Sequence, residues 1–174
     1  QYPSVCRLAI HLDGHQYCYY NKTTQTVDLL DKNAKTTLTE WFEANKKYPD
    51  GRDLLYMDYL ERFVWDKAKK EWHPRKSGHS IGRMYFVSPH EDERYYLRLL
   101  LTQIPGATSF EYLRTVNKQV YTTFKQACIE HGFLEEDLEW DRCLNEAAIM
   151  ESGYKLRRLF AIILGLNVVK NPYL

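Results

Sequence analysis

The fold is decided by residues 63–101, which read FVWDKAKKEWHPRKSGHSIGRMYFVSPHEDERYYLRLLL. Trp65 and Trp72 flank a polar run that is typical of the loop of a β-hairpin. Pairing the two tryptophans also places Asp66 opposite Glu71 and leaves a four-residue turn rich in lysine. Facing tryptophans would stabilise the hairpin by about 0.2–1 kcal/mol. The stretch therefore predicts an antiparallel hairpin with a basic tip.

The second half of this stretch predicts a strand followed by a helix. A breaker with proline and glycine at residues 73–78 precedes an apolar-rich strand at residues 80–87. SPHE at residues 88–91 is a capping box, in which the serine is the N-cap and the glutamate reaches back to it. The pattern predicts a helix from Pro89 to about Gln103.

Positive charge is concentrated between Leu60 and Arg83. Seven cationic and three anionic side chains give this segment a charge of +4, whereas the whole chain carries +1. Such uneven charge favours a local patch that contacts phosphate. A solvated hairpin tip, with lysines for solubility, is the alternative. The candidate phosphate contacts are Lys67, Lys69, Lys70, Arg75, Lys76 and Arg83, and the candidate stacking platforms, which could equally be core residues, are Trp72 and Tyr85.

The composition describes an ordered globular protein. With 174 residues, 14% aromatic and 27% charged, we expect one compact domain with a β-rich half (1–88) and a helical half (89–174). The four cysteines form no CxxC pair, which predicts reduced thiols in an intracellular protein. The longest apolar run is too short to span a bilayer. Because the chain begins without methionine, we expect it to be a segment of a longer protein.

The N-terminal region predicts a second hairpin. Residues 5–12 and 15–21 flank Asp13-Gly14, a strong signal for a two-residue hairpin turn. This register places Arg7 beside Tyr20 on the face opposite the core. That pair could stack a nucleic-acid base, or Tyr20 could be a partly exposed strand residue.

The next segment predicts a loop and a helix. Residues 22–35 are polar, and either Thr36 or Thr37 can cap the helix that follows. Residues 54–60 (LLYMDYL) fit a strand or a helix, and the choice stays open. The face expected to dock the helix has i, i+3, i+4, i+7 spacing: Leu38, Trp41, Phe42 and Asn45.

The helix predicted after Ser88 has a broad apolar surface, which indicates burial on more than one side. Arg94 and Arg98 lie four residues apart and share one side of it. They would either pair with nearby carboxylates or face a strand of DNA. Both residues are therefore candidate DNA contacts.

Short helices are predicted after Pro105-Gly106. TSFE (108–111) and TFKQ (123–126) are capping boxes, and Gly132 fits the C′ position that ends the second helix. An acidic helix opens at residues 135–137, and a last helix follows Ser152-Gly153. Its expected core stripe is Leu156, Leu159, Phe160, Ile163 and Leu164. Three cationic residues lie near the start of this helix: Lys155, Arg157 and Arg158. Positive charge is unfavourable there because the N-terminal end of the helix dipole is also positive. We therefore expect an external partner or the acidic helix to neutralise these cations.

Motifs for catalysis are missing from these residues. There is no GxxxxGK[ST] loop for ATP, no pair of histidines separated by one residue, no HExxH and no Cys/His zinc spacing. His11 and His15 flank a tight turn and would point to opposite faces. We therefore expect a non-catalytic segment with no cofactor or metal of its own.

Long motifs run in order along nearly the whole chain: VCRLAIHL (5–12), WFEANKKYP (41–49), ERFVWDKAKKEWHPRKSGHSIGRMYFVSP (61–89), ERYYLRLLL (93–101), GATSFEYLRTVNKQVYTTFKQACIEHGFLEEDLEW (106–140) and LRRLFAIIL (156–164). Together they resemble the replicase–helicase encoded by Helitron rolling-circle transposons. The resemblance implies a segment between an N-terminal nuclease, with paired histidines and a tyrosine nucleophile, and a C-terminal Pif-family helicase. The parent protein would use ATP and a divalent metal, and would act in the nucleus. No catalytic residue carries over, because none of those motifs is present.

We therefore predict an α+β fold, with N-terminal antiparallel hairpins and one helix followed by a C-terminal bundle of about five helices. The predicted function is a non-catalytic connector that links nuclease to helicase and contacts single-stranded DNA through an electrostatic track and base stacking. The alternative is an architectural or protein-interaction module, domesticated or effector-like, with no DNA contact.

Overall fold

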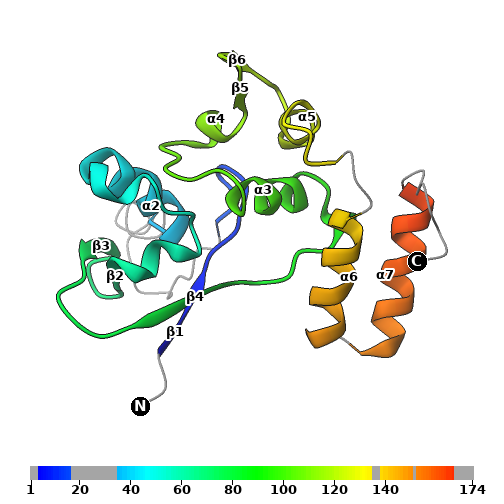
Figure 1. Cartoon of the computed structure of the whole chain (residues 1–174), viewed down its shortest axis with the longest axis horizontal. Helices are drawn as coiled ribbons and strands as arrows, with labels where there is room; N and C mark the ends of the chain where they lie inside the picture. The colour runs from blue at the N-terminus through cyan, green and yellow to red at the C-terminus, as the bar shows by residue number, and fades with distance from the viewer. Residues whose placement is uncertain (1–3, 17–34, 135–137, 151, 167–174) are drawn as a thin grey trace, which may run out of the picture.

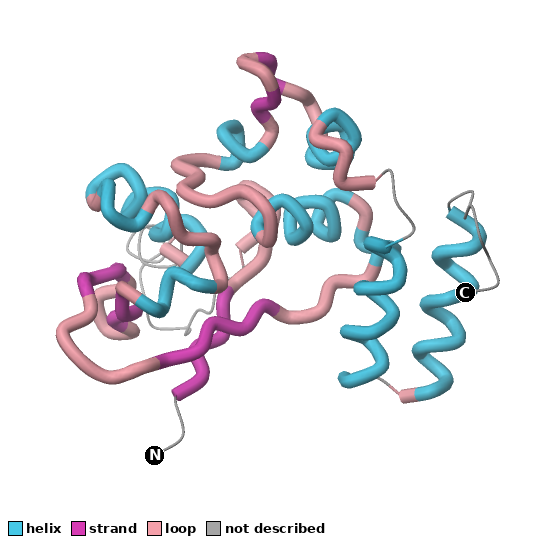
Figure 2. Tube along the Cα trace, viewed as in Figure 1, coloured by secondary structure: helices cyan, strands magenta, loops and turns pink. Residues whose placement is uncertain are grey.

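The chain has an α+β fold, which confirms the predicted class. The computed structural model describes residues 4–16, 35–134, 138–150 and 152–166 (Figure 1). The strands form three separate two-stranded sheets rather than one sheet (Figure 2). In chain order the elements are β1 (Ser4–Leu8), α2 (Thr37–Lys47), η1 (Pro49–Gly51), η2 (Asp58–Glu61), β2 (Phe63–Asp66), β3 (Glu71–Pro74), β4 (Ser80–Met84), η3 (Pro89–Glu91), α3 (Glu93–Leu101), α4 (Phe110–Leu113), β5 (Thr115–Val116), β6 (Gln119–Val120), α5 (Phe124–Glu130), α6 (Leu138–Met150) and α7 (Gly153–Leu166), where η marks 3₁₀-helices.

The β2–β3 hairpin has the predicted register, with Trp65 opposite Trp72 and Asp66 opposite Glu71. The Asp66 carboxylate closes the turn by accepting hydrogen bonds from the Ala68 and Lys69 backbone N–H groups, at 2.9 and 3.0 Å. These bonds hold the pKa of Asp66 below its ordinary value. The hairpin could therefore be predicted from the local sequence, which has paired aromatic residues and an aspartate that can cap the turn.

The structure corrects the prediction that the first strand pairs within a local N-terminal hairpin. β1 ends at Leu8 and pairs in parallel with the distant strand β4. The backbone after it is used elsewhere, because Ala9 N–H donates to Thr37 Oγ1 and Ala9 C=O accepts from the Tyr56 hydroxyl. Asp13-Gly14 does form a turn. The rest of the expected partner strand, residues 17–21 with Tyr20, and most of the predicted loop at 22–35 lie outside the described residues.

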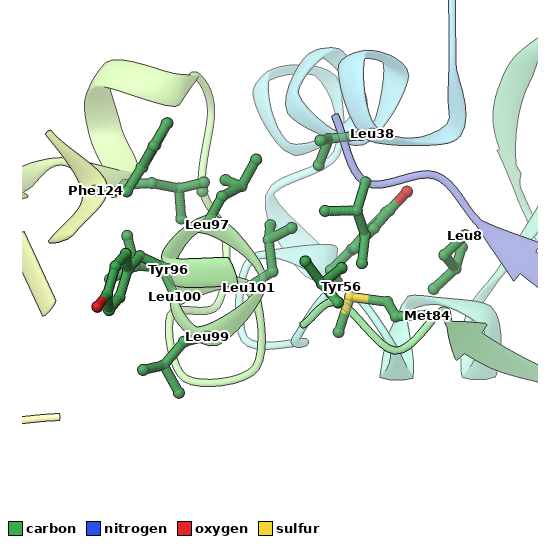
Figure 3. Close-up of a cluster of buried hydrophobic side chains, with 14 of the residues drawn as sticks. Leu8, Leu38, Tyr56, Met84, Tyr96, Leu97, Leu99, Leu100, Leu101 and Phe124 are labelled. Carbon is green, nitrogen blue, oxygen red and sulfur yellow. The ribbon is translucent and has the colours of Figure 1, made fainter. Parts of the chain in front are cut away.

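Helix α2 begins as predicted, with Thr36 as its N-cap. Every member of the predicted docking face is buried, and the buried Asn45 amide donates to the Ala107 C=O at 2.8 Å. The core continues from this helix to β1, β4 and α3, where Leu8, Met84 and Leu101 gather around Tyr56 (Figure 3). Buried residues of both predicted halves form this one cluster. The open segment 54–60 folds as turns that lead into the 3₁₀-helix η2.

The predicted helix 89–103 is interrupted near its start. Ser88 accepts from the His90 N–H as expected, but only a 3₁₀ turn follows before Asp92 takes a positive φ of 44°. Helix α3 then runs from Glu93 to Leu101. Glu91 does not reach back to the cap, because its carboxylate pairs with the Arg94 guanidinium at 2.6 Å.

The C-terminal half contains five α-helices within the described residues. Ser109, rather than Thr108, caps α4, and the small β5–β6 hairpin was not predicted. Thr123 and Gly132 behave as expected at the two ends of α5. In α7, Leu159 and Ile163 are buried.

The core stripe predicted for α7 was too wide. Phe160 and Leu164 are each 40% exposed, whereas Leu159 and Ile163 are buried. The reason is that α7 packs on α6 and η3 and therefore covers only a narrow stripe (Figure 1). No described helix is both long and apolar enough to cross a membrane.

Candidate nucleic-acid interface

The β1–β4 ribbon presents two arginines directly opposite each other. The parallel register pairs Arg7 with Arg83, and both side chains lie on the exposed face of the ribbon. Neighbouring strands lie about 4.8 Å apart, so the two positive charges start from adjacent backbones. Tyr85 continues this face: its ring is 54% exposed, and the Arg7 guanidinium carbon lies 5.5 Å from the ring centroid.

The opposite face of the ribbon is fixed to the core. Leu8 and Met84 are buried, and Gly82 lies so close to η2 that a Cβ there would overlap the Met57 carbonyl oxygen. In a strand, successive side chains point to opposite faces. The tight seating of Gly82 therefore turns Arg83 toward solvent.

Without a bound anion, the positive charges of Arg7 and Arg83 on this face repel each other. Like charges directly opposite each other on a sheet destabilise it. Among the described residues, no carboxylate forms an ion pair with Arg7 or Arg83, whereas Arg94 and Arg98 both have such partners. An anion between Arg7 and Arg83 would remove the repulsion. We call the face formed by Val5, Arg7, Ile81, Arg83 and Tyr85 the ribbon face.

The lysines around the β2–β3 hairpin differ in exposure. The charge of Lys67 is close enough to β1 to lower the pKa of Cys6, although burial, the larger cause, raises that pKa. Lys67, Lys69 and Lys76 are exposed, and Lys70 is partly buried with a positive φ of 53°. Three of the predicted lysines therefore remain accessible to a phosphate.

Arg75 is used inside the protein. Its Nε donates to the Leu60 C=O at 3.0 Å and its Nη2 to the Phe63 C=O at 3.1 Å. Arg94 likewise donates to the Ile10 C=O at 3.1 Å, in addition to its ion pair with Glu91. Both guanidinium groups thus hold backbone segments in place.

Arg98 joins two parts of the structure. It donates to the Tyr85 C=O at 3.1 Å and to the Glu146 carboxylate on α6 at 2.6 Å. For Arg94 and Arg98, the structure therefore has the carboxylate pairing that was one of the two predicted alternatives. Donors of both guanidinium groups are therefore already engaged by acceptors of the protein itself.

Trp72 is a core residue, which was one of its two predicted alternatives. The side chain is 3% exposed, and its indole N–H donates to the Thr37 C=O at 3.0 Å. It packs against Trp65 and Tyr59 in the core. A base could reach its ring only if the hairpin left α2, whereas Tyr85 is already accessible.

Arg7 has neighbours that sequence reasoning did not predict. The alternation in residues 5–12 indicates that it faces away from the core, but the local turn signal assigned it Tyr20 as a neighbour. Its actual neighbours, Arg83 and Tyr85, are more than 70 residues away in the chain. No local pattern encodes that pairing.

The described residues contain no group of three or more histidine, cysteine, aspartate or glutamate side chains placed to hold a metal ion. Cys6, Cys128 and Cys143 are free thiols, and Cys18 lies outside the described part of the chain. In comparisons with known proteins, no family model and no curated protein sequence matches this chain.

Proposed function

We propose that this chain is the non-catalytic connector of a Helitron-like replicase–helicase and that it contacts single-stranded DNA through the ribbon face. The single observation that supports DNA contact is the like-charge pair of Arg7 and Arg83 beside an exposed tyrosine. A phosphate placed between the two arginines would accept hydrogen bonds from both, because each guanidinium group donates in a fork. Lys67, Lys69 and Lys76 are exposed and would add further phosphate contacts.

A single strand suits this surface better than a duplex. Tyr85 and its apolar neighbours Val5 and Ile81 are 54%, 54% and 39% exposed. Aromatic side chains stack on bases that are not already paired and stacked in a duplex, and each such contact contributes about 1–3 kcal/mol. Because the net charge of the chain is only +1, affinity must come from this local patch.

The connector role rests on the resemblance of the sequence motifs. In the proposed parent, the nuclease would precede and the helicase would follow this segment, and those two domains would use the divalent metal and ATP. The segment itself would pass the displaced strand from one enzyme to the other inside the nucleus. Its rigid ribbon, seated on η2 through Gly82, suits that positioning role.

The test is fluorescence anisotropy with a labelled single-stranded oligonucleotide at low salt. We expect the double variant Arg7→Ala/Arg83→Ala, and separately Tyr85→Ala, to weaken binding. The matched control is Lys46→Ala/Lys118→Ala, which removes the same charge from α2 and from the β5–β6 turn. Absent binding by the parent chain, or an equal loss in the control, would reject DNA contact through the ribbon face.

A second candidate function is an architectural or protein-interaction module without DNA contact. The observation that favours it is the exposure of apolar side chains on α6 and α7: Ile149 is 84%, Tyr154 69% and Phe160 40% exposed. If this face docks a neighbouring domain, Phe160→Ser should weaken binding to that domain, measured by calorimetry, and leave DNA affinity unchanged.

A further inference from the structure

A cavity opens between the segment that follows β4 and the α6–α7 pair. Its volume is about 330 Å³, within the range of about 300–1,000 Å³ that is usual for small-ligand sites. Figure 1 shows the chain after β4 running toward α6, and η3 contacts α7. The cavity is therefore walled by parts of both halves of the sequence: Phe86, Ser88, His90, Glu91, Ala147, Lys155, Arg158, Leu159 and Ile162.

The lining separates into an apolar part and a basic part. Phe86, Leu159 and Ile162 offer a flat ring and two branched side chains, and Lys155 and Arg158 are exposed residues on the first two turns of α7. This combination suits a ligand with a flat, weakly polar group joined to an anion. Neither a plain hydrocarbon nor a bare inorganic ion would use both parts.

The acidic side chain in the lining forms an ion pair with an arginine outside the cavity. The Glu91 carboxylate lies 2.6 Å from the guanidinium group of Arg94 on α3, so the charge of Glu91 is paired with that arginine. Ser88 adds a hydroxyl group, which already accepts from the His90 N–H and has a proton left to donate. The polar groups of the cavity thus include donors for phosphate oxygens.

We propose that this cavity binds one nucleotide unit, with the base against Phe86 and Ile162 and the phosphate at Lys155 and Arg158. The choice of ligand rests on the proposed function, because Tyr85 of the ribbon face directly precedes Phe86. Arg98 ties the Tyr85 carbonyl to Glu146 of α6, so the platform and the cavity keep a fixed relation. A strand that leaves the ribbon face can therefore place its next base in the cavity.

The test is an NMR titration of the ¹⁵N-labelled 174-residue chain with thymidine monophosphate, thymidine and inorganic phosphate. We expect the monophosphate to shift the amides of Phe86, Ser88 and Leu159, and to bind at least about tenfold more tightly than thymidine or phosphate alone. Binding of inorganic phosphate as tight as that of the nucleotide, or shifts elsewhere only, would overturn the proposal.

Matched variants sharpen the result. Lys155→Ala/Arg158→Ala should weaken the binding of thymidine monophosphate by about tenfold or more. Arg157→Ala, on the same helix but outside the cavity lining, should leave that binding unchanged. Ile162→Trp should fill the cavity and abolish binding, whereas Leu164→Trp should not. Because the alanine variants change exposed side chains only, they remain informative if Ile162→Trp fails to fold. Unchanged binding in Lys155→Ala/Arg158→Ala overturns the proposal.

The two proposals fail separately. If single-stranded DNA binds and Arg7→Ala/Arg83→Ala removes it, but thymidine monophosphate leaves the cavity amides unshifted, the ribbon proposal stands and the cavity proposal is wrong. If the monophosphate shifts the cavity amides while single-stranded DNA does not bind, the cavity is a mononucleotide site and the proposed function is wrong.

Discussion

Replacing Arg83 by glutamate should stabilise the fold and weaken DNA binding at the same time. Arg7 lies directly opposite Arg83 in the parallel register, so Arg83→Glu converts a repulsive cross-strand pair into an attractive one. Each of these pair terms amounts to about 0.2–1 kcal/mol. The variant should therefore gain about 0.4–2 kcal/mol in unfolding free energy, and less at high salt because the pair is exposed.

The effect on binding can be worked out from the number of accessible cations. Arg7, Arg83, Lys67, Lys69 and Lys76 are five candidate phosphate contacts. A single strand loses affinity with a log–log salt slope of about −0.7 for each contact, which gives about −3.5 for five. Between 50 and 200 mM salt, affinity would then fall by about 100-fold. Arg83→Glu removes at least one contact, so the slope should become shallower by about 0.7.

The assays are urea denaturation and fluorescence anisotropy across a salt series. Lys118→Glu is the control, because it makes the same charge change on the β5–β6 turn, away from the ribbon face; it should leave the salt slope unchanged. A structural role alone predicts that Arg83→Glu moves stability and binding in the same direction. The reasoning is refuted if the variant is less stable than the parent, or if its salt slope equals that of the parent.

Three further predictions concern the support of the site. Gly82→Ala should cost about 1–3 kcal/mol in urea denaturation, because the new Cβ would overlap the Met57 carbonyl oxygen. Arg98→Ala should lower the free energy of unfolding by about 1.5–3 kcal/mol. The value should lie toward the lower end because the partner, Glu146, is 45% exposed. Burial lowers the pKa of His11, so unfolding free energy should fall as pH drops below about 6.5, and His11→Gln should reduce that slope.

Each of these has a contrary outcome. An unchanged midpoint in Gly82→Ala would mean that β4 is not seated on η2 as described. Full stability in Arg98→Ala, or rescue by lysine, would show that the forked contact to Tyr85 and Glu146 is unimportant. For His11 the sign follows from the unfolded chain, which binds the proton more readily than the folded protein does. An equal pH slope in His11→Gln would assign the dependence to other groups.

Local chemistry made part of this structure predictable. The β2–β3 register follows from paired tryptophans and an aspartate that caps the turn, and α2 follows from the Thr36 cap and an apolar stripe. The capping box at Ser88 misled because its glutamate, Glu91, pairs with Arg94 instead. The α-helix begins only at Glu93, whose carboxylate accepts from the Phe124 and Lys125 N–H groups at the start of α5. A cap for a distant helix is invisible in a local pattern.

The site was harder to predict because it depends on non-local pairing. Charge density pointed to the segment around Arg83, but it counted the inward-facing Arg75 together with the exposed cations. An arginine turns inward where a backbone carbonyl is available to accept its hydrogen bond, as the carbonyls of Leu60 and Tyr85 do. Sequence spacing contains no record of those carbonyls.

The division between inward and outward arginines is the strongest argument for a partner. Where this chain uses an arginine for its own stability, it supplies acceptors: two carbonyls for Arg75, and a carbonyl with a carboxylate for Arg98. Solubility alone would be served by cations that are spread apart, because spacing reduces their repulsion. Arg7 and Arg83 instead occupy paired positions on adjacent strands, in a register that Gly82 fixes against the core. In the proposed function, an anion bound between Arg7 and Arg83 would offset the repulsion that this register creates.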